Sequence, residues 1–124
     1  LSSWDQTDII ATAFKYNKTD WDEEHRFFFS LLNEEEVYSK RLGIVWILQN
    51  RKHLNAESAI RTLAKCDDEN EYYISMAIAW AFSFFYLDNP ENKSYMKEAS
   101  AITLKRTRQK IRDSRRYKGE FLVL

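Results

Sequence analysis

The hydrophobic pattern is dominated by one stretch, Tyr72 to Leu87, in which sixteen consecutive residues carry no formal charge. A membrane-spanning helix needs about 20 apolar residues, and two serines and three tyrosines interrupt this shorter run. A helix that is apolar on all sides is normally enclosed by other helices. Its small residues, which would let neighbouring helices approach closely, are Ser75, Ala77, Ala79, Ala81 and Ser83. The pattern therefore predicts a central core helix and no membrane span.

Trp80 lies in the middle of this stretch, among alanines. An indole of that size either fills a deep hole in the core or projects from the helix as a flat platform. Periodicity alone leaves both alternatives open.

Helical spacing of apolar residues and capping signals predict helices along the rest of the chain. Asn55 is expected to cap one of them, and Asn89-Pro90 is a cap followed by a first-turn proline. An aromatic stripe from Trp21 to Leu32 is predicted to be core, and Leu104 and Ile111 are expected on the packed side of the last helix. The expected helices cover Trp4 to Tyr16, Trp21 to Leu32, Glu34 to Gln49, Ala56 to Lys65, Glu91 to Ala99 and Thr103 to Arg116.

The order of these segments predicts an α-solenoid of antiparallel helix pairs, of the HEAT-like or armadillo type. Trp4, Arg41 and Trp80 are separated by 37 and 39 residues, which is close to the period of HEAT-type pairs. The three residues are therefore expected on equivalent helices along one side of the stack. We predict a single HEAT-like domain over residues 1–124.

Composition supports the all-α prediction. The 124 residues suffice for one domain, and two glycines and one proline leave little material for β-turns or long loops. The single cysteine, Cys66, excludes an internal disulfide, and a cytoplasmic setting is expected. Because the first residue is Leu, we expect a fragment of a longer protein.

The net charge is zero, but the basic residues are concentrated near the C-terminus. The segment from Lys105 to Lys118 holds eight basic residues and one acid. Such a segment suits either a polyanion-binding surface or a solvated helix face, and charge alone favours neither.

Arg41 falls on the apolar stripe formed by Val37, Ile44, Val45 and Leu48. A guanidinium in that position needs a carboxylate, a phosphate or open water, because burying it unpaired is prohibitively costly. The alternative is that the stem of Arg41 packs while its head reaches the solvent.

Four sequence stretches carry a family pattern: SWDQTD at residues 3–8, KRLGIVWIL at 40–48, YYISMAIAW at 72–80 and KIRDSRR at 110–116. Together they resemble the HEAT-like DNA alkylation repair glycosylases of the AlkD type. The tyrosine-rich helix followed by a basic helix is the most specific of these features. The similarity covers essentially the whole chain but only about the C-terminal half of the family's usual length, so an N-terminal half is expected to be missing.

The resemblance implies excision of N3- and N7-alkylated purines from double-stranded DNA, with Asp8 as the catalytic residue. Trp4 and Trp80 would hold the cationic nucleotide, and Arg41 would bind a backbone phosphate. The leaving purine is already cationic, so the reaction needs negative charge beside the oxocarbenium-like sugar more than it needs a general acid. The basic helix is expected to contact DNA through Arg108, Arg112, Arg115 and Arg116.

No cofactor is expected. His25 and His53 lack the neighbouring ligands of a metal site, and the chain contains no glycine-rich phosphate loop. The competing hypothesis is a non-catalytic α-solenoid that binds nucleic acid or protein through its concave face, with Asp8 and Arg41 as an ion pair.

Overall fold

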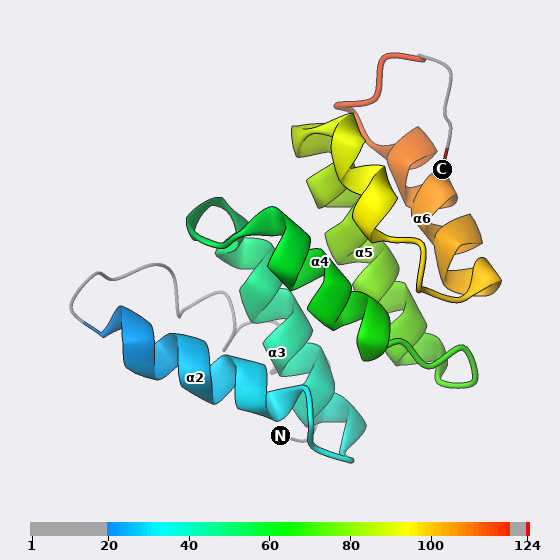
Figure 1. Cartoon of the computed structure of the whole chain (residues 1–124). Helices are drawn as coiled ribbons and strands as arrows, with labels where there is room; N and C mark the ends of the chain where they lie inside the picture. Colours follow the sequence, from blue (N-terminus) through cyan, green and yellow to red (C-terminus); the bar gives the residue numbers. More distant parts are fainter. Residues whose placement is uncertain (1–19, 120–123) are drawn as a thin grey trace. The chain divides into compact units, whose positions relative to one another are not determined.

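The computed structural model describes residues 20–119 and 124, which form helices and their connections with no strand among them (Figure 1). The all-α prediction is confirmed for this part of the chain. The chain divides into two compact units, residues 1–54 and 55–124. The first contains α2 (Trp21–Leu31), α3 (Val37–Gln49) and the 3₁₀ segment η1 (Arg51–His53). The second contains α4 (Ala56–Lys65), α5 (Tyr72–Asp88), the 3₁₀ segment η2 (Pro90–Tyr95) and α6 (Ala101–Asp113). The solenoid predicted for residues 1–124 stays a prediction.

In the first unit, α2 and α3 pack around Trp46, which is fully buried. The Phe28 ring stacks on Trp46 with centroids 5.1 Å apart, and Trp21 stacks on it at 5.2 Å. Gly43 permits this close packing, because a Cβ atom there would lie 2.7 Å from the Phe28 carbonyl oxygen. Phe28 and Leu32 are buried as the aromatic stripe predicts, whereas Trp21 and Phe29 remain partly exposed.

The helix predicted to start at Glu34 begins at Val37 instead. Glu36 occupies the N-cap position, where its carboxylate accepts a hydrogen bond from the Tyr38 backbone N–H at 3.2 Å. A capping side chain satisfies an amide that has no partner within the helix, so the helix starts after the acids. The apolar run from Leu42 to Leu48 is buried throughout, as its composition indicates.

In the second unit, α5 is the central helix and packs against α4, η2 and α6. The prediction of a core helix over Tyr72 to Leu87 is confirmed, and α5 extends one residue further, to Asp88. All five small residues of this stretch are buried. Their small side chains allow close approach of the neighbouring helices.

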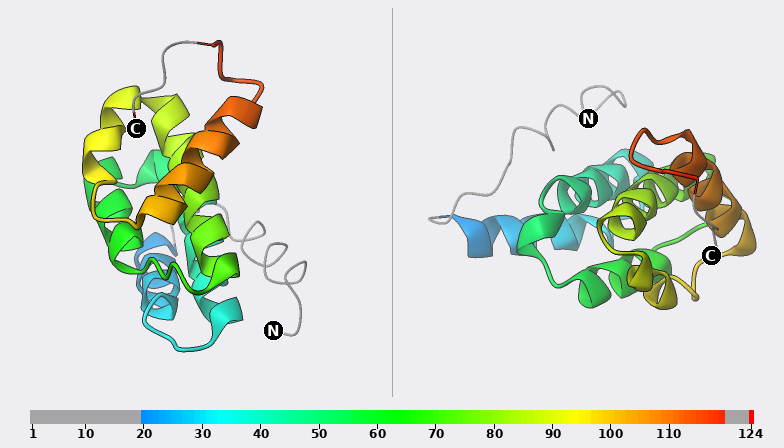
Figure 2. Two further views of the ribbon diagram at one scale, coloured as in Figure 1. Left: turned by 90° about the vertical axis from the view of Figure 1, so that its right-hand side faces the viewer. Right: turned by 90° about the horizontal axis from the view of Figure 1, so that it is seen from above.

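Helix α6 lies beside α5 and runs parallel to it (Figures 1 and 2). Ser75 shares a hydrogen bond with Thr103 near the start of both helices. Asp88, the last residue of α5, pairs with Arg116 just beyond the end of α6. Both pairs are 28 residues apart in sequence, as expected for two helices that run in the same direction. The predicted bounds, Thr103 to Arg116, are wrong at both ends. Ser100 caps the helix by accepting from the Thr103 N–H at 3.2 Å, and the extended backbone of Ser114 ends it.

The packed side of α6 also differs from the prediction. Ile111 is fully buried as expected, but Leu104 is only partly buried. Thr103 and Thr107 take the remaining buried positions; Thr107 lies four residues after Thr103 and four before Ile111. Their hydroxyls are satisfied, since Thr107 donates to the Thr103 carbonyl at 2.8 Å and Thr103 donates to the Asp67 carboxylate at 2.7 Å.

The α-helix predicted over Glu91 to Ala99 is replaced by the shorter 3₁₀ segment η2. Asn89 caps it as predicted, accepting from the Glu91 N–H at 3.1 Å. The buried Asn92 side chain donates to the Phe85 carbonyl at 2.9 Å and so ties the segment to the end of α5. Backbone bonds of the i→i+3 type, including Met96 N–H to Lys93 at 3.1 Å, keep it in the tighter 3₁₀ winding.

Candidate functional site

The predicted site residues fall into three groups in the structure. Trp4 and Asp8 lie outside the described residues. Arg41 belongs to α3 of the first unit and Trp80 to α5 of the second. The assignment of these four side chains to one substrate site therefore stays a prediction, and each described residue is placed within its own unit.

Arg41 is partly exposed at the start of the buried run of α3. Its neighbours in sequence, Leu42 and Gly43, are buried. The guanidinium is therefore not enclosed in the core, which leaves open both a packed stem with a solvated head and an anion-binding role.

Trp80 is not part of the deep core. Its neighbours Ala79 and Ala81 are fully buried, whereas Trp80 is partly exposed and its ring lies 6.5 Å from that of Phe84 in an edge-to-face arrangement. It lines an open pocket of about 250 Å³ between α5 and α6. The structure thus favours the platform alternative, with the indole on the side of α5 that faces α6. The other lining residues are Ser83, Phe84, Leu87, Lys110, Asp113 and Ser114.

A second pocket, of about 310 Å³, continues this depression toward the start of α5. Lys110 and Asp113 line both pockets, so we treat the two as one feature, the α5/α6 groove. Its α5 wall is apolar and largely aromatic, and its α6 wall is polar. The α5 wall consists of Tyr72, Met76, Trp80, Ser83, Phe84 and Leu87, and the α6 wall of Arg106, Gln109, Lys110, Asp113 and Ser114.

The polar wall of the groove carries two cations and one carboxylate. The Arg106 guanidinium lies 4.8 Å from the centroid of the Tyr72 ring, and its Nη1 atom is buried with no hydrogen-bond partner among the described residues. Lys110 follows one turn later, on the same face of α6. The Asp113 carboxylate accepts a hydrogen bond from the Gln109 side chain at 3.0 Å.

The four arginines predicted to bind DNA do not line this groove. Arg108 donates to the Leu124 carbonyl oxygen at 3.4 Å, and Arg116 forms an ion pair with Asp88 at 2.9 Å. Arg112 is exposed on α6, and Arg115 is exposed beyond the end of that helix. Arg115 and Arg116 therefore lie beyond α6, although the predicted helix bounds included them.

Sequence reasoning identified the basic segment but did not single out Arg106 and Lys110. Their spacing of four residues places both on one helix face, and that signal was present in the sequence. What was missing was the register of α6 against α5, which brings this face beside Tyr72, Met76 and Trp80. Only packing fixes that register.

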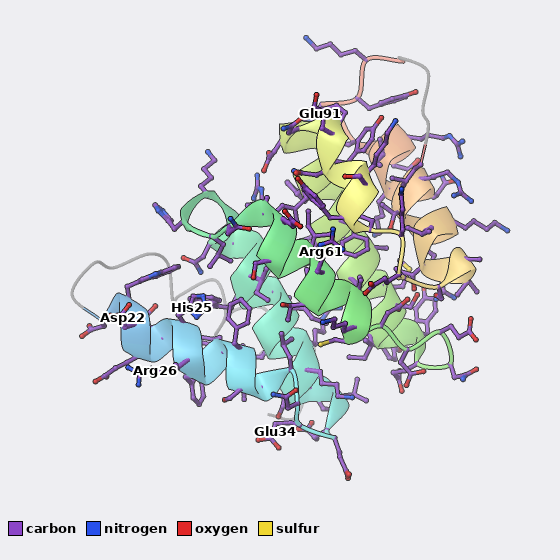
Figure 3. All side chains as sticks on the ribbon, in the orientation of Figure 1. Asp22, His25, Arg26, Glu34, Arg61 and Glu91 are labelled. Carbon is purple, nitrogen blue, oxygen red and sulfur yellow. The ribbon has the colours of Figure 1, made fainter. Side chains whose placement is uncertain are left out.

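The first unit has an open depression of about 480 Å³ on α2, lined by Trp21, Asp22, His25 and Arg26. Figure 3 labels the three polar members along this helix. The His25 ring stacks on Phe29 with centroids 4.2 Å apart, which makes it part of the aromatic cluster around Trp46. Among the described residues no group of three or more His, Cys, Asp or Glu side chains is arranged to hold a metal ion.

Comparison of the chain with family models, with curated proteins and with solved structures finds no match. Within the described ranges, no helix combines the length and the apolar character needed to cross a membrane.

Proposed function

We propose that this protein is a DNA repair glycosylase that hydrolyses the N-glycosidic bond of cationic N3- and N7-alkylated purines in double-stranded DNA. The family resemblance suggests the reaction. The observation that carries the proposal in the structure is the α5/α6 groove, in which the partly exposed Trp80 lies beside Lys110 and Asp113. HEAT-like stacking is part of the same proposal, and the parallel course of α5 and α6 supports it.

The composition of the groove suits the charge distribution of the substrate. An alkylated purine nucleotide carries a positive ring and a negative phosphate. The Trp80 indole and the Asp113 carboxylate both attract a cation, and a cation–π contact contributes about 0.5–2 kcal/mol, depending on desolvation. Lys110 offers the opposite charge for the phosphate on the same wall.

The chemical step is assigned to Asp8 on the basis of the resemblance. Its carboxylate would stabilise the positive charge that develops on the sugar and would position the attacking water. Trp4 would support the sugar and ring faces, and Arg41 would bind a backbone phosphate through its forked donors. Bond cleavage releases a neutral purine, so no general acid is needed at the leaving group.

A base-release assay tests this function. The complete protein is incubated with methylated double-stranded DNA, and released 7-methylguanine is quantified for the wild type, Asp8→Asn and Asp5→Asn. We expect Asp8→Asn to lower the rate at least about a hundredfold, since it removes the charge that stabilises the transition state. Asp5→Asn is the matched control, because it removes the same charge from the same sequence stretch at a position to which the resemblance assigns no role, and it should retain most of the activity.

The same experiment separates the competing functions. Unchanged base release by Asp8→Asn eliminates the catalytic assignment. Binding of DNA without base release by the wild type supports the non-catalytic α-solenoid instead.

A further inference from the structure

The part of the α5/α6 groove nearest the start of α5 has the features of an anion site. Its pocket of about 310 Å³ is lined by Tyr72, Met76, Arg106, Gln109, Lys110 and Asp113. The Arg106 guanidinium lies over the Tyr72 ring, and this contact holds it in one place. A held guanidinium loses less conformational freedom when it binds a ligand than a mobile one does.

The Nη1 atom of Arg106 is shielded from water but donates no hydrogen bond within the described part of the chain. Burial closes this atom to the pocket, so a ligand there has to meet the rest of the guanidinium. The Arg106 side chain is only partly buried and lines the pocket, and a phosphate oxygen suits a guanidinium especially well.

The charges around the pocket favour an anion. Lys110 lies one turn after Arg106 and makes no hydrogen bond or ion pair with the described residues. The one carboxylate in the lining, Asp113, already accepts from Gln109 at 3.0 Å. Two cations thus face the pocket against one carboxylate, so the lining carries a net positive charge.

We infer that the Tyr72–Arg106 pocket binds a phosphodiester group of the DNA backbone, with the Arg106 guanidinium donating hydrogen bonds and Lys110 supplying a second positive charge. This inference rests on the proposed function and names a phosphate contact that the family resemblance does not assign. Tyr72 and Trp80 are eight residues apart on α5, or about 12 Å along the helix axis. That distance corresponds to about three to four nucleotide steps of 3.4 Å, so one bound duplex can occupy both parts of the groove.

The test is the salt dependence of DNA affinity for Arg106→Gln and Lys110→Gln, measured with an unmodified duplex over a series of salt concentrations. Each lost phosphate contact should weaken binding and reduce the slope of log K against log salt by about 0.9. Lys105→Gln is the matched control, because it removes the same charge from an exposed neighbouring position on α6 outside the pocket lining. It should leave the slope unchanged.

Thermal unfolding of each variant separates lost binding from lost folding. Arg106→Gln also removes the contact with Tyr72 and can therefore lower stability. Lys110 makes no hydrogen bond or ion pair with the described residues, so Lys110→Gln should fold normally. Its DNA affinity then tests the phosphate contact without a change in folding. If Arg106→Gln and Lys110→Gln bind DNA with the same affinity and salt slope as Lys105→Gln, the inference is overturned while the proposed function stands. Weaker binding at an unchanged slope also overturns it. A wild-type protein that does not bind DNA overturns both.

Discussion

Asp67 joins the connection after α4 to the start of α6, and its replacement by Ala should weaken the second unit. One carboxylate oxygen accepts from the Ser100 backbone N–H at 2.7 Å, and the other accepts from the Thr103 hydroxyl at 2.7 Å. Thr103 is fully buried and shares a further hydrogen bond of 2.6 Å with Ser75 on α5. Asp67 therefore fixes the N-terminus of α6 against both neighbouring segments.

The magnitude follows from the two bonds. A hydrogen bond to a charged group contributes about 1.5–3 kcal/mol, so the pair sets an upper limit of about 3–6 kcal/mol. Asp67 is partly exposed, and Thr103 keeps its contacts with Ser75 and with the Ser100 hydroxyl, so part of the loss is recovered. We expect Asp67→Ala to lower the free energy of unfolding by about 2–3 kcal/mol.

Urea unfolding measures the loss, and hydrogen exchange of the Ser100 amide reports its local origin. Asp68→Ala is the matched control, because the neighbouring Asp68 is exposed and accepts only a local bond from the Asn70 N–H at 3.0 Å. The control should change stability by less than about 1 kcal/mol. Equal stabilities for the two variants, with unchanged protection of the Ser100 amide, would refute the assigned role of Asp67.

Three further substitutions test the packing. Gly43→Ala should destabilise the first unit by about 1–3 kcal/mol in thermal or urea unfolding, because the new methyl group would lie 2.7 Å from the Phe28 carbonyl oxygen. A neutral effect would contradict so close an approach. Arg116→Ala should change the unfolding free energy by less than about 1 kcal/mol, because its ion pair with Asp88 is exposed. Asn92→Ala should cost about 0.5–1.5 kcal/mol, since it removes a buried hydrogen bond to the Phe85 carbonyl, which keeps its bond from the Asn89 N–H at 3.1 Å; an unchanged urea midpoint would count against that contribution.

Local sequence signals were sufficient for most helices of the described chain. The uncharged run of α5 and the apolar spacing of α4 each predict a buried helix, because hiding apolar side chains from water dominates their energetics. Asn55 and Asn89 cap their segments as expected, accepting from the Ser58 and Glu91 amides. Such caps depend only on residues within one turn, which is why sequence alone reveals them.

Helix ends that depend on distant residues were predicted poorly. The start of α6 is fixed partly by Asp67, more than thirty positions earlier, and its packed face uses threonines whose hydroxyls are satisfied in the structure. A pattern of apolar residues does not reveal buried threonines of this kind. The segment after Asn89 likewise takes its 3₁₀ winding with Asn92 bonded to α5.

For the candidate site, sequence patterns identified Trp80 as an unusual aromatic in a core helix and the last helix as basic. Helix packing places Trp80 toward α6 and puts Arg106 and Lys110 in its groove, while Arg116 pairs with Asp88. The hydrophobic pattern of a helix specifies which face is buried but not its register along a neighbour. That register follows from side-chain packing and from hydrogen bonds between residues far apart in sequence, such as Ser75 and Thr103.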